Sequence, residues 1–187
     1  MKLRCPDSND PKFFHAFGRG NDHRPICLDD GDRKAFLFHL GRSVRRHGWQ
    51  CLAYCLMDNH FHLVVHTTPL ALSRGLRDFK SGHAQGFHKA HGTTGHLFEP
   101  NPRPRVIRNE AYLFTTLAYV LWNPVDAGCC RDPGDWEWSS FRSTLQPGMK
   151  HDWFDPTAVL SIFREDLIAA RTAFADFVRA GSPRRRS

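Results

Sequence analysis

Short stretches of alternating hydrophobic and polar residues are interleaved with longer stretches of helical periodicity, so the chain predicts both strands and helices. A first strand is expected in FFHAFGRG. WQCLAYCLM and HFHLVVHT predict a hairpin that turns at Asp58 and Asn59. Between strand and hairpin, DDGDRKAFLFHLGRSVRRHG has the pattern of an amphipathic helix, with Gly48 as its stop.

The second half continues the same alternation of elements. Pro69 is expected to open a helix, because the first helical position needs no N–H donor. Residues 103–107 predict a short edge strand, the one kind of strand that tolerates Pro104. A helix from Glu110 should end near Asn123, because a residue that precedes proline is biased away from helical geometry. Two further helical pieces are expected within 136–145 and 155–180.

The predicted order is strand–helix–strand–strand–helix–strand–helix. This order is typical of an α+β fold, the ferredoxin-like split βαβ sandwich with an antiparallel sheet. We expect that domain to span residues 1–145. Residues 146–187 then form a C-terminal helical extension that ends in a basic tail with Arg184, Arg185 and Arg186.

Composition narrows the class of protein. The 187 residues are 41% hydrophobic, enough for one well-cored domain and too many for a disordered chain. The sequence contains no run of about 18 apolar residues, so no membrane span is expected. MKLRCPDSNDPK lacks the apolar core of a secretory signal, which predicts a cytoplasmic protein. The net charge of +7, mostly from arginine, favours a polyanionic partner such as nucleic acid.

The triplet His60-Phe61-His62 is the strongest candidate for chemistry. Residues two apart on a strand lie about 6.6 Å from each other and point to the same face. Two imidazoles held in this way can bind one divalent ion. His66 lies on the same face of a regular strand and is an alternative ligand, although it is expected at the strand's end.

The helix after Glu110 supplies a second candidate. Its apolar stripe consists of Leu113, Leu117, Val120 and Leu121. Its other side carries Tyr112, Thr116, Tyr119 and Asn123. A phenol oxygen can attack a DNA phosphate if charge is neutralised nearby, which an ion on the His pair can do. Tyr112 is the alternative nucleophile, and an ordinary half-buried tyrosine is the alternative interpretation of Tyr119.

YCLMDNHFHLVV, YVLWNPVDAG and WEWSSF occur in the order in which similar blocks occur in the REP-associated tyrosine transposases, which the chain resembles from about Phe14 to Phe141. These are single-tyrosine members of the HUH endonuclease superfamily. The resemblance implies that His60 and His62 bind Mg²⁺ or Mn²⁺, with Asn123 as a third ligand. It implies that Tyr119 forms a 5′-phosphotyrosine and leaves a 3′-hydroxyl.

The resemblance also implies a substrate and a setting. The substrate would be single-stranded or hairpin DNA from palindromic repeats, cut by a monomer or homodimer associated with the bacterial nucleoid. Arg74 and Arg77, together with the basic tail, are candidate contacts to the DNA backbone; a solvated helix face and a solubilising tail are the alternatives. Asp58 stands where the family usually has proline, and EPNPRPRVI is richer in proline than the family's block.

Two other functions are compatible with the same residues. One is a catalytically silent module that binds hairpin nucleic acid on the same fold. The other is a hydrolase in which His60, His62 and Asp58 hold an ion that activates water. Formation of a covalent protein–DNA adduct distinguishes the transposase chemistry from both.

Overall fold

Four antiparallel strands form one sheet in the order β2-β3-β1-β4. The structure is a computed structural model, and it describes residues 10–100, 103–146 and 151–181. Because β1 and β3 are the central pair, residues on these two strands meet across the middle of the sheet. The strands are β1 (Lys12–Arg19), β2 (Gln50–Leu56), β3 (His60–Thr67) and β4 (Arg105–Ile107).

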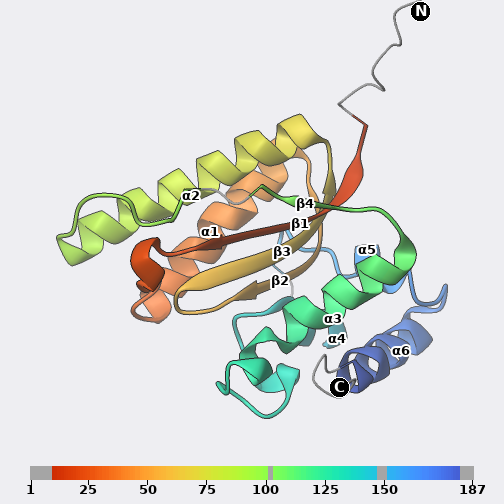
Figure 1. The fold of residues 1–187 in the computed structure, drawn as a ribbon. Helices are drawn as coiled ribbons and strands as arrows, with labels where there is room; N and C mark the ends of the chain where they lie inside the picture. Colours follow the sequence, from red (N-terminus) through yellow and green to blue (C-terminus); the bar gives the residue numbers. More distant parts are fainter. Residues whose placement is uncertain (1–9, 101–102, 147–150, 182–187) are drawn as a thin grey trace, which may run out of the picture.

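Helices cover both faces of the sheet (Figure 1). Two long helices pack side by side on one face, and a third helix lies on the other with three shorter ones. The order β1-α1-β2-β3-α2-β4-α3 confirms the expected split βαβ sandwich. The helices are α1 (Asp30–His47), α2 (Pro69–His91), α3 (Glu110–Asp126), α4 (Ser140–Leu145), α5 (Thr157–Leu160) and α6 (Leu167–Ala180).

Local sequence explains where the first two helices begin and end. Gly48 ends α1 in the left-handed region at φ 63°, a conformation that costs glycine little. The hydroxyl of Thr68 accepts a hydrogen bond from Ala71 N at 3.2 Å, and Pro69 follows it as the first residue of α2. Both boundaries therefore confirm the sequence prediction.

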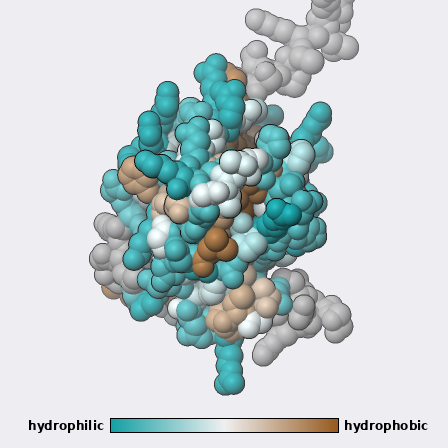
Figure 2. Space-filling view, turned by 90° about the vertical axis from the view of Figure 1, so that its left-hand side faces the viewer, coloured by the Kyte–Doolittle hydropathy of each residue, from teal (hydrophilic) through white to brown (hydrophobic). Residues whose placement is uncertain are grey.

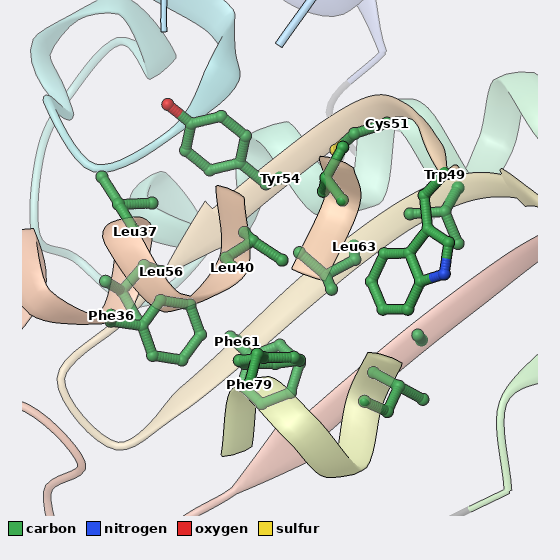
Figure 3. Packing of buried hydrophobic residues seen from close by; sticks show 14 of the residues in the cluster. Phe36, Leu37, Leu40, Trp49, Cys51, Tyr54, Leu56, Phe61, Leu63 and Phe79 are labelled. Carbon is green, nitrogen blue, oxygen red and sulfur yellow. The ribbon is translucent and has the colours of Figure 1, made fainter. Parts of the chain in front are cut away.

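Successive side chains of the central strands point to opposite faces of the sheet, and a hydrophobic core lies on each face. The first core lies between the sheet and α1 and α2, where Phe61 packs against Phe36 and Phe79 with ring centroids 5.3 and 5.2 Å apart (Figure 3). The second lies under α3 and includes Leu117 together with Phe174 of α6. The last helix of the expected C-terminal extension thus shares a core with α3.

The predicted end of α3 was wrong. The helix continues through Pro124 to Asp126, because the proline ring is buried and the chain beyond it keeps bonding. Ala127 N donates to Asn123 O, and Cys129 N donates to Pro124 O, so a full turn forms after the proline. Asn123 consequently stays in helical register one turn after Tyr119.

The helical prediction for 136–145 was also only partly right. Helix α4 begins at Ser140, and the residues before it run along β2 instead. Leu56 N donates to Trp138 O at 2.9 Å, and Trp136 Nε1 donates to Leu56 O at 2.9 Å. An edge strand offers unpaired backbone groups, and these bonds satisfy some of them. The expected piece 155–180 is broken into α5 and α6.

The face of the molecule at the left of Figure 1, which Figure 2 turns toward the viewer, is mostly hydrophilic, with hydrophobic side chains in small separate areas. Within the described ranges, every helix is too short or too polar to cross a membrane.

Candidate functional site

The two histidines of the triplet start strand β3 and point toward α3. The turn before them is closed by Met57 N, which donates to His60 O at 2.8 Å. The rings of His60 and His62 lie 5.2 Å apart between centroids. His62 is buried, with 7% of its surface exposed, and His60 is half-buried. The strand therefore holds both imidazoles on one face, as the spacing predicts.

Helix α3 brings the tyrosine and the asparagine to this face. The Tyr119 ring lies 5.2 Å from the ring of His62, and its side chain is 39% exposed. Asn123 Oδ1 lies 2.8 Å from His60 Nε2. Tyr119 and Asn123 reach the same pair of histidines because they are four residues apart on one helix. All four candidate residues are thus gathered at one place.

The contacts of His60 say which of its nitrogens carries the proton. Its Nδ1 lies 2.7 Å from Asn59 Oδ1, and the amide nitrogen of Asn59 donates to His23 O at 3.2 Å. The amide oxygen of Asn59 is thereby turned toward the ring, so Nδ1 is the donor in the neutral imidazole. The Nε2 lone pair then faces Asn123 Oδ1. His60 Nε2 and Asn123 Oδ1, 2.8 Å apart in a contact whose polarity depends on the tautomer of His60, are both atoms that can bind a cation.

His15 is a member of the site that sequence reasoning missed. This residue of β1 is buried, with 6% exposed, and its Nε2 lies 3.1 Å from His62 Nδ1. A hydrogen bond between these atoms leaves His62 Nε2 as the ring nitrogen available to a ligand. The fold order makes β1 and β3 neighbours, which is a signal that could have drawn attention to a histidine on β1. Whether its side chain meets that of His62 depends on the register between β1 and β3, which the sequence does not reveal.

Burial keeps these imidazoles neutral. Desolvation, with a smaller contribution from Arg105, lowers the pKa of His15 to about 4. Desolvation is also the main cause that lowers the pKa of His62 to about 2, and the neighbouring His15 and His60 make smaller contributions in the same direction. The pKa of His60 is lowered by burial, with Asn123 acting in the opposite direction. Neutral imidazoles present lone pairs, which is the form that binds metals.

Lowering the pH from 6.5 toward 4 should therefore destabilise the metal-free protein. The unfolded chain takes up protons near pH 6.5 that buried His15 and His62 resist until their lower pKa values. Stability is fully present above pH 6.5 and is lost as the pH falls, by about 1.4 kcal/mol per pH unit for each such histidine. Urea unfolding with chelator should show this loss, and His15→Gln should reduce it. Equal slopes in both proteins would contradict the assignment.

Two hollows flank Tyr119. One, of about 450 Å³, is lined by Phe17, Gly18, Arg19, His60, His62, Glu99, Pro100 and Tyr119. The other, of about 290 Å³, is lined by His15, Phe17, His62, Arg105, Tyr112, Thr115, Thr116 and Tyr119. The two share Tyr119, His62 and Phe17. The phenol thus stands between a hollow that contains the His pair and a second, more aromatic one.

The alternative site residues lie elsewhere or have other contacts. His66 is on the same face of β3 but at its far end, where its ring packs on Phe13 with centroids 4.6 Å apart. Asp58 Oδ1 accepts a hydrogen bond from Arg33 Nη2 at 2.6 Å. Tyr112 lines the smaller hollow, two turns before Tyr119. Among these, only Tyr112 contributes to the walls around Tyr119.

Of the candidate DNA-contacting arginines, the two that the structure describes are not part of this site. Arg74 and Arg77 are exposed on α2, which covers the opposite face of the sheet (Figure 1). Arg184, Arg185 and Arg186 lie outside the described residues. Contact of Arg74 and Arg77 with DNA stays a prediction, and it would require the nucleic acid to reach the far face of the sheet.

A separate group of potential metal ligands lies where α1 begins. It consists of Asp29, Asp32 and His91, which each offer one ligand atom, and these three atoms lie within 4.8 Å of one another. Asp29 Oδ1 accepts from Asp32 N, Asp32 Oδ2 accepts from Leu28 N, and His91 Nε2 lies 2.9 Å from both Asp32 oxygens. These bonds cap α1 and tie it to the end of α2. The group thus has a structural role that needs no ion.

Comparisons with known proteins identify the fold. No protein-family profile matches the chain, and no curated protein sequence matches it. Among solved structures, the chain is similar to a REP-associated tyrosine transposase bound to a REP hairpin, with a TM-score of 0.62 and 16% identity over 83% of this chain and 91% of that one. It is also similar to a protein described as a candidate transposase from Deinococcus radiodurans R1, with a TM-score of 0.43 and 16% identity over 66% of this chain and 97% of that one. The first likeness shows that the two proteins share a fold.

Proposed function

We propose that this protein is a metal-dependent endonuclease and strand transferase that cuts single-stranded DNA beside a hairpin, with Tyr119 as its nucleophile. One observation carries the proposal: the partly exposed side chain of Tyr119 lies next to the imidazoles of His60 and His62 and the amide oxygen of Asn123. The fold shared with a REP-associated tyrosine transposase supports it.

The donor set suits a divalent ion. His60 Nε2 and Asn123 Oδ1 converge at 2.8 Å, and His62 has one ring nitrogen left after its bond to His15. His60, His62 and Asn123 would therefore hold the ion, and two imidazoles favour Mn²⁺ over the harder Mg²⁺. When bound, the ion would neutralise charge on a phosphate oxygen and orient the scissile phosphate.

The protein's own residues would then carry out the transfer. The scissile phosphate enters the 450 Å³ hollow, where the exposed guanidinium of Arg19 adds positive charge at the rim. The Tyr119 oxygen attacks phosphorus and its proton passes to solvent. A bond forms between that oxygen and phosphorus, the bond from phosphorus to the 3′-oxygen breaks, and the leaving oxygen takes up a proton.

The products are a 5′-phosphotyrosine and a free 3′-hydroxyl. Because the phosphate ester is kept rather than hydrolysed, a second 3′-hydroxyl can reverse the step and join to the held strand. Strand transfer then needs no nucleotide cofactor. Single-stranded DNA is proposed as the substrate because the resemblance to the REP-associated tyrosine transposases implies it.

The hairpin is proposed from the partner of the similar structure and from charge. That protein was solved with a REP hairpin. The net charge of +7 favours a polyanion. A folded stem would position the DNA by its shape, and unpaired bases beside the stem would specify the cut. A monomer or a homodimer can do this, since the four site residues described above come from one chain.

Adduct formation tests the proposal. DNA hairpins with single-stranded flanks, drawn from palindromic repeats and labelled at the 3′ end, would be incubated with the protein and Mn²⁺ and separated on a denaturing gel. A labelled band at the mass of protein plus DNA is expected, because the tyrosine keeps the 5′ phosphate of the downstream fragment. Chelator should remove it. The same substrate labelled at the 5′ end should give free cut DNA and no adduct.

Other outcomes would favour the alternatives. Hairpin binding without adduct or cleavage, with and without Mn²⁺, would indicate a silent binding module. Metal-dependent cleavage without adduct would indicate activated water. The ion pair of Asp58 with Arg33 already removes one carboxylate oxygen from the ligand set that the hydrolase alternative uses.

A further inference from the structure

The smaller hollow beside Tyr119 has the walls of a site for a flat aromatic ligand. Its volume of about 290 Å³ is at the low end of small-molecule sites, roughly 300–1,000 Å³, and suits one heterocycle. Phe17 and Tyr112, both half-buried, and the ring of Tyr119 supply aromatic surface. Four elements contribute lining residues to this hollow: β1, β3 and β4 of the sheet, and α3, which covers them.

The polar groups of this hollow are mostly satisfied within the protein. Thr116 Oγ1 donates to Tyr112 O at 2.7 Å, and Thr115 Oγ1 donates to Ala111 O at 2.9 Å. His15 is bonded to His62. Recognition here therefore depends on shape and on stacking more than on donated hydrogen bonds, which suits a ring with a π-face.

The one full charge at this hollow is at its mouth. Arg105 is exposed, and its guanidinium carbon lies 5.6 Å from the centre of the Phe17 ring. A cation in this place can contact the phosphate of a nucleotide whose base lies inside. The hollow thus combines an aromatic interior with an anion-binding rim, as sites for single-stranded nucleic acid do.

The position of the hollow beside Tyr119 indicates which nucleotide would bind in it. It shares Phe17, His62 and Tyr119 with the hollow that contains the His pair. A strand whose scissile phosphate meets Tyr119 therefore has its neighbouring nucleotide next to this opening. We propose that the hollow binds the base of a nucleotide adjacent to the scissile phosphate, turned out of the strand. This inference rests on the proposed function for the place of the cut.

The test combines DNA substrates that lack one base with a protein variant in which a larger side chain fills the hollow. Hairpin substrates would carry an abasic residue at each unpaired position in turn. Thr115 is exposed on α3 at the hollow, so Thr115→Trp can fill it without disturbing a core. Thr172→Trp on α6 is the matched control, because Thr172 is also an exposed threonine bonded to the carbonyl four residues before it. Both the dissociation constant and the rate of adduct formation would be measured.

With the wild-type protein and with Thr172→Trp, one position next to the cut should be sensitive. Its abasic substrate should bind or react roughly 5- to 150-fold more weakly than the intact one. With Thr115→Trp, the intact substrate should be weakened by a similar factor and the abasic penalty at that position should disappear. The choice of base at that position should matter less than its presence.

Two results would overturn the inference: no sensitive position beside the cut, or a penalty that persists in Thr115→Trp. Failure of the proposed function looks different. In that case no adduct forms with any substrate, while the dissociation constants still show whether one unpaired base is bound at the hollow.

Discussion

Replacing Tyr119 by phenylalanine should abolish the covalent protein–DNA adduct, lowering its rate by at least about a thousandfold, as loss of a nucleophile does in other enzymes. The substitution removes one oxygen and keeps the ring that packs 5.2 Å from His62. Hairpin affinity and thermal stability should therefore stay close to the wild-type values. Quantifying adduct on a denaturing gel, beside binding measured by fluorescence anisotropy, separates the chemical step from recognition.

Tyr112→Phe is the matched control for this experiment. Tyr112 is on the same helix, lines the neighbouring hollow and loses the same oxygen in the variant. It should form adduct at nearly the wild-type rate. Adduct that persists in Tyr119→Phe and vanishes in Tyr112→Phe would reassign the nucleophile. Cleavage that persists in both variants, without adduct, would favour water activated at the metal site.

Much of the fold was predictable because the signals are local. The alternation of residues along a strand, a glycine after an amphipathic helix and a proline at the start of a helix each act within a few residues. The structure confirms Gly48 and Pro69 in these roles. The element order then left few possible topologies. The placement of the His pair could also be predicted from the sequence, because strand geometry alone puts His60 and His62 on one face.

The errors and omissions concern long-range packing. Pro124 was expected to end α3, but the burial of its ring and the hydrogen bonds that follow it outweigh the local preference. The residues before Ser140 were expected to be helical, yet they form hydrogen bonds along the edge of β2 that has no neighbouring strand. From the sequence His15 was interpreted as a structural histidine, because its partner is 47 residues away and only the register of two strands brings them together.

Asn123 lies within α3, four residues after Tyr119, and the chain continues in helical geometry to Asp126. Its helical register places Oδ1 at 2.8 Å from His60 Nε2, and the side chain of Asn59 turns the lone pair of that nitrogen toward it.

His60→Ala should lower both Mn²⁺ affinity and the rate of adduct formation, the latter by roughly a thousandfold, because a bound metal ion contributes several kcal/mol to stabilising a phosphoryl-transfer transition state. The side chain is half-buried at the start of β3, and its removal leaves the core residue Phe61 in place. Calorimetric titration with Mn²⁺ and the gel assay would measure the two effects on one preparation. Higher Mn²⁺ concentrations should restore part of the rate, since His62 and Asn123 remain.

His66→Ala is the control that the strand itself provides. His66 projects from the same face of β3, six residues further on, but packs against Phe13 and has no contact with α3 among its described ring partners. Its loss should leave Mn²⁺ binding and adduct formation within about twofold of wild type, since surface changes away from a site have small effects. If His66→Ala lost the metal and His60→Ala kept it, the ion would belong at the far end of the strand and Tyr119 could not use it. If neither variant changed Mn²⁺ affinity while both still formed adduct, the nucleophile would act without an ion on this strand.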